Sequence, residues 1–341
     1  MTIVMYEGNK RLRVDEGGRR EPQAGEVRIR VAYAGICGTD LHIYHGHMDA
    51  RVELPHIMGH EMSGIVSAVG EGVTGCAPGD RVTVRPLDAC GECPACLDGY
   101  AHVCHRLRFL GIETEGAFQS EWIVPAQTLH RLPDALSLKH AAMIEPLAVA
   151  CHDVRLGEVQ PGEYVVVLGG GPIGMLIALV ARQAGARVLV SEINPFRLRM
   201  ASELGLDVVN PQEQDAEALV LRETGGRGAD AVFEVTSSAA GAELMTRLPR
   251  TRGRIVVVGI FNHKPQIDLH RFFWRELKLC GARVYEREDF EAAIRLAAEG
   301  ALPLERLITH TYPLAQAELG FKQMESGGDA MKVMLACGGE Q

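Results

Sequence analysis

Residues 164–174 read Tyr-Val-Val-Val-Leu-Gly-Gly-Gly-Pro-Ile-Gly. The apolar first half predicts a parallel β-strand that is buried on both faces. Gly169, Gly171 and Gly174 follow at the spacing of a GxGxxG turn, whose glycines permit a tight turn, close approach of the backbone to a pyrophosphate, and close helix–strand packing. Residues 175–184 have a helical composition, so we expect a helix N-terminus that binds phosphate.

The chain beyond this turn continues to alternate strands and helices. Further strands are predicted at residues 187–192, 230–235 and 254–259. This alternation implies a doubly wound parallel sheet. Glu192 ends the next strand, where a carboxylate can accept both ribose hydroxyls of an adenosine, and this favours NAD over NADP. Arg197 is close enough to approach a 2′-phosphate, and an ordinary glycine-rich loop is the alternative to a cofactor site.

Residues 90–104 carry four cysteines at intervals of three, three and eight. They are Cys90, Cys93, Cys96 and Cys104. Thiolates on so short a loop can close a tetrahedral shell around Zn²⁺ with no open position, which indicates a structural metal site. Disulfides are the alternative, but residues 1–7 do not resemble a secretory leader, and cytosolic thiols stay reduced. We therefore predict a structural zinc.

A second candidate metal site lies upstream, at Cys37 and His60. A thiolate and an imidazole both suit zinc, and Glu61 or Glu145 could add an oxygen ligand. Three protein ligands plus water make an open, catalytic arrangement. Taken singly, a histidine beside a glycine turn is more often only hydrogen-bonded, and Glu145 could be a solvated acid at a helix end. Spacing alone therefore leaves this site undecided.

The order of these motifs supplies a resemblance to a known family. The motifs are Cys37-Gly38-Thr39-Asp40, Gly59-His60-Glu61 with Gly64 after it, the four-cysteine segment and the glycine turn. In this order they resemble the zinc-dependent medium-chain dehydrogenase/reductase family, in its sorbitol (polyol), butanediol and threonine dehydrogenase branch. The resemblance implies an α/β protein with a GroES-like β-rich catalytic domain and a doubly wound Rossmann domain. The expected bounds are 1–147 for the catalytic domain, with a zinc lobe at about 88–105, 148–282 for the Rossmann domain, and 283–341 for a return to the catalytic domain.

The same resemblance implies a role for each site residue. The catalytic zinc would be held by Cys37, His60, Glu61 and Glu145. Asp40 would be an outer partner of this metal. The zinc would lower the pKa of a substrate hydroxyl, and the alcohol carbon would give a hydride to NAD⁺. Thr39 would take the alcohol proton and pass it through the nicotinamide ribose to His42. Further cofactor contacts are expected from Pro172, Ile173, Val258, Gly259 and Ile260.

Three classes of substrate compete. Glu145 and the Pro-Leu-Ala-Val-Ala run after it resemble sorbitol and butanediol dehydrogenases, so a polyol, sugar alcohol or vicinal diol oxidised to a ketone is favoured. L-Threonine 3-dehydrogenases are also similar, but Val149 stands where they carry asparagine. Sorbitol dehydrogenases grip substrate with an Arg-Tyr pair; Tyr285 matches it, and Val284 replaces the arginine. For a sugar acid (aldonate), the carboxylate could be bound by Arg283, Arg287 or Lys264.

Composition narrows the remaining possibilities. The 341 residues include 35 lysines and arginines against 44 acids, a formal charge of −9, which disfavours nucleic-acid and membrane partners. No apolar run reaches 18 residues. We expect a cytoplasmic enzyme with two zinc ions per chain and a small-molecule alcohol substrate. A homotetramer or dimer is expected, with residues 254–259 onward as an edge strand for pairing. Relatives that lost zinc and became structural proteins would show eroded ligands, whereas here the ligands are intact.

Overall fold

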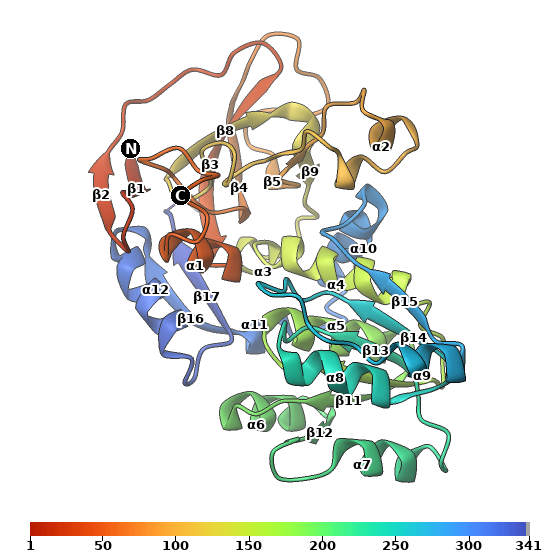
Figure 1. Ribbon diagram of the computed structural model, residues 1–341. Coiled ribbons are helices and arrows are strands. Elements are labelled where there is room, and N and C mark those ends of the chain that lie inside the picture. The colour runs from red at the N-terminus through yellow and green to blue at the C-terminus, as the bar shows by residue number, and fades with distance from the viewer. Residues whose placement is uncertain (339–341) are drawn as a thin grey trace. The chain divides into compact units, whose positions relative to one another are not determined.

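The computed structural model describes residues 1–338 and contains two compact units (Figure 1). Unit 1 consists of Met1–Glu145 together with the chain from Glu286 onward. Unit 2 is the continuous segment Pro146–Tyr285. Unit 1 is therefore built from both ends of the chain, and unit 2 from its middle.

Unit 1 is organised around a seven-stranded sheet with the order β16-β17-β3-β4-β5-β9, in which β8 also pairs with β3. The strands are β3 (Glu26–Gly35), β4 (Glu61–Val69), β5 (Arg81–Val84), β8 (Glu121–Pro125), β9 (Leu129–Arg131), β16 (Ile308–Pro313) and β17 (Lys332–Ala336). The antiparallel register sets Gly35 opposite both Glu61 of β4 and Met334 of β17. One end of this sheet thus collects residues from three distant parts of the sequence.

Smaller elements complete unit 1. Two short hairpins pair β1 (Thr2–Tyr6) with β2 (Leu12–Glu16), and β6 (Leu87–Asp88) with β7 (Arg108–Phe109). The α-helices are α1 (Gly38–Tyr44), α2 (Pro94–Leu97), α3 (Leu138–Ala141), α10 (Arg287–Ala298), α11 (Leu304–Leu307) and α12 (Ala317–Ser326). The 3₁₀-helices are η1 (Ala101–Val103), η2 (Ala126–Thr128) and η3 (Leu314–Gln316).

Unit 2 is a six-stranded sheet in which every neighbouring pair is parallel, in the order β12-β11-β10-β13-β14-β15. Its strands are β10 (Tyr164–Leu168), β11 (Arg187–Ser191), β12 (Asp207–Val209), β13 (Ala229–Glu234), β14 (Pro249–Val257) and β15 (Lys278–Gly281). Its helices are α5 (Pro172–Gln183), α6 (Pro195–Glu203), α7 (Ala216–Glu223), α8 (Ala239–Arg247) and α9 (Leu269–Arg275), and α4 (Ile144–Leu156) crosses the boundary between the units. This arrangement confirms the predicted doubly wound sheet.

Burial explains why residues 164–168 form the central strand. All five residues of β10 are buried, as a strand covered on both faces requires. Helix α5 packs on β10 and β11, and buries the run Gly174–Ala181. Each fully buried aliphatic side chain in such a layer stabilises the fold by about 1.5–3 kcal/mol relative to exposure.

Two sequence-based details are corrected by the structure. Helix α5 begins at Pro172 instead of residue 175, because proline at the first helical position is already set to a helical φ. The expected edge strand at residues 254–259 is wrong, since β14 lies between β13 and β15. Within the described residues, the two edge strands of this sheet are β12 and β15. Within residues 1–338, no helix combines the length and apolar character that crossing a bilayer requires.

Candidate active site

The end of the unit 1 sheet brings three predicted metal ligands together. β3 ends at Gly35, two residues before Cys37, and β4 begins at Glu61, directly after His60. Because Gly35 and Glu61 are register partners, the two loops meet at one point. One ligand atom from each of Cys37, His60 and Glu61 lies within 4.8 Å of the others.

Asp40 fixes the two loops that carry these ligands. Its carboxylate is completely buried and accepts the N–H of Cys37 at 2.8 Å and the N–H of Gly59 at 3.2 Å. The capping interaction with Cys37 also starts helix α1. Asp40 Oδ1 lies 3.6 Å from His60 Nδ1, and that buried nitrogen has no hydrogen-bond partner. A buried, unsatisfied imidazole beside a thiol and a carboxylate fits a zinc ion.

The charged groups around His60 favour a positive charge at its imidazole, which a proton or a metal ion can supply. Burial lowers the pKa of His60, but the negative charges of Asp40 and Cys37 outweigh burial and raise that pKa well above its ordinary value. Zinc requires a neutral imidazole, so metal binding at this site releases a proton.

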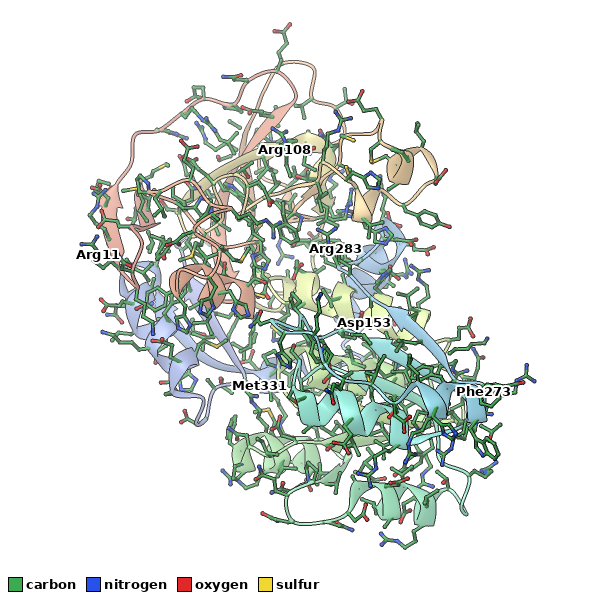
Figure 2. The ribbon with its side chains drawn as sticks, in the orientation of Figure 1. Arg11, Arg108, Asp153, Phe273, Arg283 and Met331 are labelled. Carbon is green, nitrogen blue, oxygen red and sulfur yellow. The ribbon has the colours of Figure 1, made fainter. Side chains whose placement is uncertain are left out.

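Lys332 belongs to this site, and the sequence reasoning missed it. It is the first residue of β17, next to Met331 (labelled in Figure 2), and its ammonium forms an ion pair with Glu61. The side chains are 2% and 1% exposed. Burial lowers the pKa of Lys332, but Glu61, Cys37 and Glu145 raise it above its usual value, so the lysine is charged. The available signal was a lysine inside an otherwise apolar strand sequence.

Gly35 is required by this ion pair. A Cβ at position 35 would collide with the carboxylate of Glu61 and would lie 2.9 Å from Cε of Lys332. Glu145, in the first turn of α4, is buried and close enough to act on the pKa of Lys332. Among the described residues, however, the three-membered ligand group does not include Glu145.

The proposed proton-relay residues share one short helix. Thr39 and His42 are three positions apart on α1, which places them on the same face. His42 Nδ1 lies 3.4 Å from Nδ1 of His47. Partial burial lowers the pKa of His42, and the neighbouring His47 and His45 lower it further. His42 is therefore neutral near pH 7 and able to accept a proton.

The four cysteines form a compact sulfur cluster. Cys93 Sγ lies 3.5 Å from Cys96 and 3.8 Å from Cys104, and Cys90 Sγ lies 4.0 Å from Cys96 and 3.4 Å from Cys104. A zinc–sulfur distance of about 2.3 Å gives a tetrahedral edge of about 3.8 Å, so the cluster has the dimensions of a zinc shell. These separations are far longer than a disulfide, and all four thiols are free.

Backbone groups prepare these sulfurs to carry negative charge. The N–H of His105 donates to Cys93 Sγ at 3.4 Å, and the N–H of Arg106 donates to Cys104 Sγ at 3.3 Å. Hydrogen bonds from the backbone N–H groups of Glu92 and Cys93 lower the pKa of Cys90 to about 6. The set therefore fits a structural zinc.

The glycine turn of unit 2 leaves space that the protein itself does not fill. Gly169 has φ +101°, and a Cβ on Gly174 would overlap the carbonyl oxygen of Gly169. By contrast, a Cβ on Gly171 would only approach Arg197 Nη1 at 3.6 Å. Gly171 caps helix α5 without a side-chain bond, so the free N–H groups of the helix face this space. Close approach of a phosphate accounts for glycine at position 171.

Glu192 is anchored beside this turn. Its carboxylate accepts the N–H of Gly170 at 2.8 Å, of Ile193 at 2.7 Å and of Asn194 at 2.8 Å. Arg197 Nη1 lies 3.8 Å from Glu192 Oε2, so the arginine predicted to complicate cofactor choice is partly neutralised by that carboxylate.

The remaining predicted cofactor residues lie at the start of helix α5 and directly after strand β14. Pro172 and Ile173 open helix α5, and the N–H groups of Val258 and Gly259 both donate to the Glu234 carbonyl at 2.9 Å. Ile260 is 72% exposed.

The segment compared with the sorbitol-binding pair departs from that role. Tyr285 is completely buried, and Val284 adopts φ +49°, a left-handed conformation rare for a β-branched residue. Arg287 is paired with Glu291 at 2.9 Å, whereas Arg283 and Lys264 are exposed cations of unit 2.

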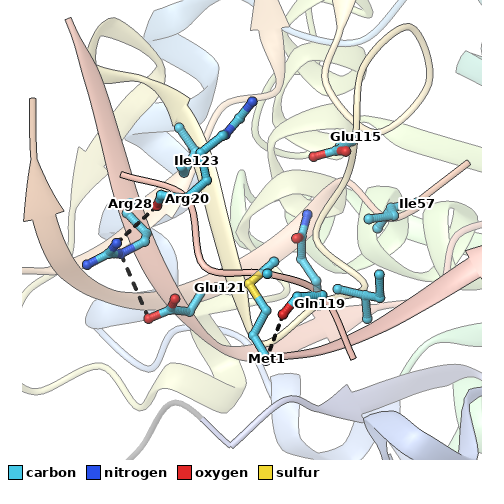
Figure 3. A pocket seen from close by; sticks show the side chains of 11 residues that line it. Met1, Arg20, Arg28, Ile57, Glu115, Gln119, Glu121 and Ile123 are labelled. Atoms are coloured by element: carbon cyan, nitrogen blue, oxygen red, sulfur yellow. Dashed lines mark hydrogen bonds and ion pairs between the residues drawn. The ribbon is translucent and has the colours of Figure 1, made fainter. Parts of the chain in front are cut away.

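A separate hollow of about 220 Å³ lies in unit 1 (Figure 3). Its lining includes Met1, Arg28 and Glu121 but none of the predicted site residues. Arg28 is buried and donates to the carbonyl of Arg20 and the carboxylate of Glu21, both at 3.0 Å. Its charge is therefore already compensated.

A four-cysteine cluster with the dimensions of a zinc shell and a dinucleotide-type glycine turn, present in one chain, are the features of a zinc-binding, NAD(P)-dependent dehydrogenase that acts on CH–OH groups. A family model of the alcohol dehydrogenase GroES-like domain matches residues 23–134, and one of the zinc-binding dehydrogenases matches residues 172–299. The chain belongs to the zinc-type medium-chain dehydrogenase family, and the predicted GroES-like and Rossmann folds are confirmed.

Similar proteins cover nearly the whole chain. A 2-dehydro-3-deoxy-L-galactonate 5-dehydrogenase of Pseudoalteromonas atlantica is 52% identical over 341 residues, 100% of each chain. A sorbitol dehydrogenase of Halalkalibacterium halodurans is 35% identical over 98% of each chain, and an L-galactonate-5-dehydrogenase of Escherichia coli is 34% identical over 86% of each. The crystal structure of 2R,3R-butanediol dehydrogenase from Bacillus subtilis has a TM-score of 0.91 at 30% identity, covering 98% of this chain and 99% of that one.

Alanine substitutions at Gly174 and Gly171 test the cofactor turn. Gly174→Ala forces a Cβ into the Gly169 carbonyl and should reduce the free energy of unfolding by about 1–3 kcal/mol. Gly171→Ala meets no such obstacle and should cost less than about 1 kcal/mol. It should nevertheless weaken NAD⁺ binding about tenfold or more, since the new methyl group occupies the phosphate approach. Thermal unfolding and calorimetric titration with NAD⁺ measure both effects. Unchanged NAD⁺ affinity in Gly171→Ala would contradict the assignment.

Proposed function

We propose that this protein oxidises a secondary hydroxyl of a sugar acid, of the 2-keto-3-deoxy-aldonate type, to a ketone with NAD⁺. The observation that carries the proposal is the 52% identity, over the full length of both chains, to an enzyme named for 2-dehydro-3-deoxy-L-galactonate. A second relative is also named for oxidation of a galactonate at carbon 5. The sorbitol dehydrogenase relative is less similar, so the sugar-acid alternative replaces the polyol as the favoured substrate class.

A sugar acid differs from a polyol by its carboxylate, which calls for a cation. Of the three cations considered from the sequence, Arg287 is engaged with Glu291. Arg283 and Lys264 are exposed and have no ion-pair partner among the described residues, so they stay the candidates for binding the carboxylate.

The chemistry follows from the residues around Cys37. When bound, zinc supplies a Lewis acid for the substrate oxygen, and the nicotinamide accepts the hydride. Cys37, His60 and Glu61 would hold the metal, with Glu145 as a second carboxylate nearby. The Thr39 hydroxyl accepts the proton of the alcohol, and His42 passes a proton on to solvent. The lowered pKa of His42 supports this role, because a neutral imidazole is ready to accept and a weak base releases readily.

A substrate panel tests the proposal. NAD⁺ reduction should show the highest kcat/KM for 2-dehydro-3-deoxy-L-galactonate, lower values for L-galactonate, and the lowest for sorbitol, 2,3-butanediol and L-threonine. NADP⁺ should be the poorer cofactor, because Glu192 places a negative charge beside the expected 2′-position. A preference for sorbitol or butanediol would return the assignment to the polyol branch, and threonine as sole substrate would assign the third class.

The relay is tested at Thr39. Thr39→Val keeps the shape of the side chain and removes the hydroxyl, so kcat should fall about 10²- to 10⁴-fold with the zinc content unchanged. Cys37→Ser is the matched control, since it should lose the catalytic zinc together with activity. Wild-type turnover in Thr39→Val would exclude the hydroxyl from proton transfer.

We also infer that the chain forms a homo-oligomer through the open edge of the unit 2 sheet. Among the described residues, β15 pairs only with β14 and is one of the two edge strands of the sheet, and Leu279 on it is 45% exposed. The adjoining helix α9 exposes Phe273 at 80% and Trp274 at 73%, and Phe273 projects outward (Figure 2). An apolar patch around an open edge favours pairing with a second copy. Sedimentation as a 37.1-kDa monomer would contradict this inference.

A further inference from the structure

The carboxylate of Glu61 belongs both to an ion pair and to the candidate metal site. It forms an ion pair with Lys332, and one of its oxygens lies in the ligand group with Cys37 and His60. Both partners of the ion pair are almost completely buried, so water does not screen their attraction. The negative charge of Glu61 that Lys332 neutralises is therefore less available to a metal ion bound in the same site.

We propose that Lys332 is a positioning residue that competes with the catalytic metal for Glu61. By holding the carboxylate, Lys332 limits its bond to the metal, keeps a coordination position available to substrate and makes the metal exchangeable. This inference rests on the assignment of a zinc ion to Cys37, His60 and Glu61 in the proposed function.

The charges around the site support this role. Cys37 as a thiolate, Glu61 and Glu145 bring three negative charges, against two positive charges on zinc. Lys332, whose buried ammonium is paired with the Glu61 carboxylate, supplies the third positive charge. Asp40 is a further buried acid, but its charge is stabilised by the N–H groups of Cys37 and Gly59.

The position of Lys332 is tightly specified. The lysine opens β17, and the register of β17 against β3 sets it at the end of the sheet where Gly35 has no side chain. The space that glycine leaves is occupied by the Glu61 carboxylate and the end of the lysine side chain. Neither partner can therefore turn away from the other without rearranging the core.

A purely structural ion pair predicts the opposite behaviour. If the pair only stabilised the fold, loss of the lysine would loosen the site, and the metal would leave faster. If Lys332 competes for Glu61, its removal leaves the metal as the cation paired with that carboxylate. The metal would then leave more slowly while turnover falls, because the open position becomes harder to obtain.

The decisive measurement is zinc release from the holoenzyme into a chromogenic chelator. The four-cysteine site provides an internal reference, because the substitutions lie outside it. We expect Lys332→Met to slow release of the catalytic zinc about tenfold, the lower end of the effect of outer partners on metal affinity. Lys332→Arg keeps the charge and should release zinc at close to the wild-type rate. If Lys332→Met does not fold, Lys332→Gln replaces it, and we expect the same decrease in the rate of zinc release.

The same substitution in a Glu61→Gln variant tests whether Lys332 acts on the metal through Glu61. Glu61→Gln removes the carboxylate, so adding Lys332→Met to it should change the release rate less than about twofold. Faster or unchanged release in a folded Lys332→Met protein, by circular dichroism, would overturn the proposal. So would slowing that persists in the Glu61→Gln background. A wild-type chain that holds zinc only at the four cysteines would contradict the proposed function instead.

Discussion

The antiparallel register at Gly35 is the constraint on which the candidate active site depends. It sets the end of β3 against the start of β4 and the start of β17, so that Cys37, Glu61 and Lys332 converge from remote positions in the chain. A slip of one residue would turn each strand's side chains to the opposite face and separate these groups. The buried carboxylate of Asp40 then holds the loops in place, which explains how a site with several charges remains ordered.

Each unit has a glycine at its candidate site, and the two glycines have different roles. In unit 2 the protein leaves a space at Gly171 and offers backbone N–H groups, so a phosphate is bound by the shape of the turn. In unit 1 the protein fills the space at Gly35 with a carboxylate and an ammonium, so charge is concentrated where a metal would bind. Glycine is thus needed in both places, once for a ligand and once for neighbouring side chains.

Local motifs were predictable from the sequence, and long-range partners were not. The four cysteines lie within one loop, and the strand and helix that flank the glycine turn are adjacent to it, so spacing alone predicted both. Lys332 was not predicted as a site residue, because only the pairing of β17 with β3, far upstream in the sequence, brings it to the site. The edge strand was misplaced because hydrophobic runs identify a strand without giving its order in the sheet. The proposed substrate class rests on whole-chain similarity, because the short motifs of this sequence favoured a polyol.

The position of β17 has a consequence for biosynthesis. Unit 2 is one continuous segment, and all the strands of its sheet are synthesised before β16 and β17. The unit 1 sheet is completed later, because β3 pairs with β17, which follows all of unit 2 in the sequence. A nascent chain that has not yet reached β17 therefore has Cys37, His60 and Glu61 but lacks the buried lysine that accompanies them. The residues of the candidate catalytic metal site are therefore complete only once β17 has been made, whereas the four cysteines of residues 90–104 are all present much earlier.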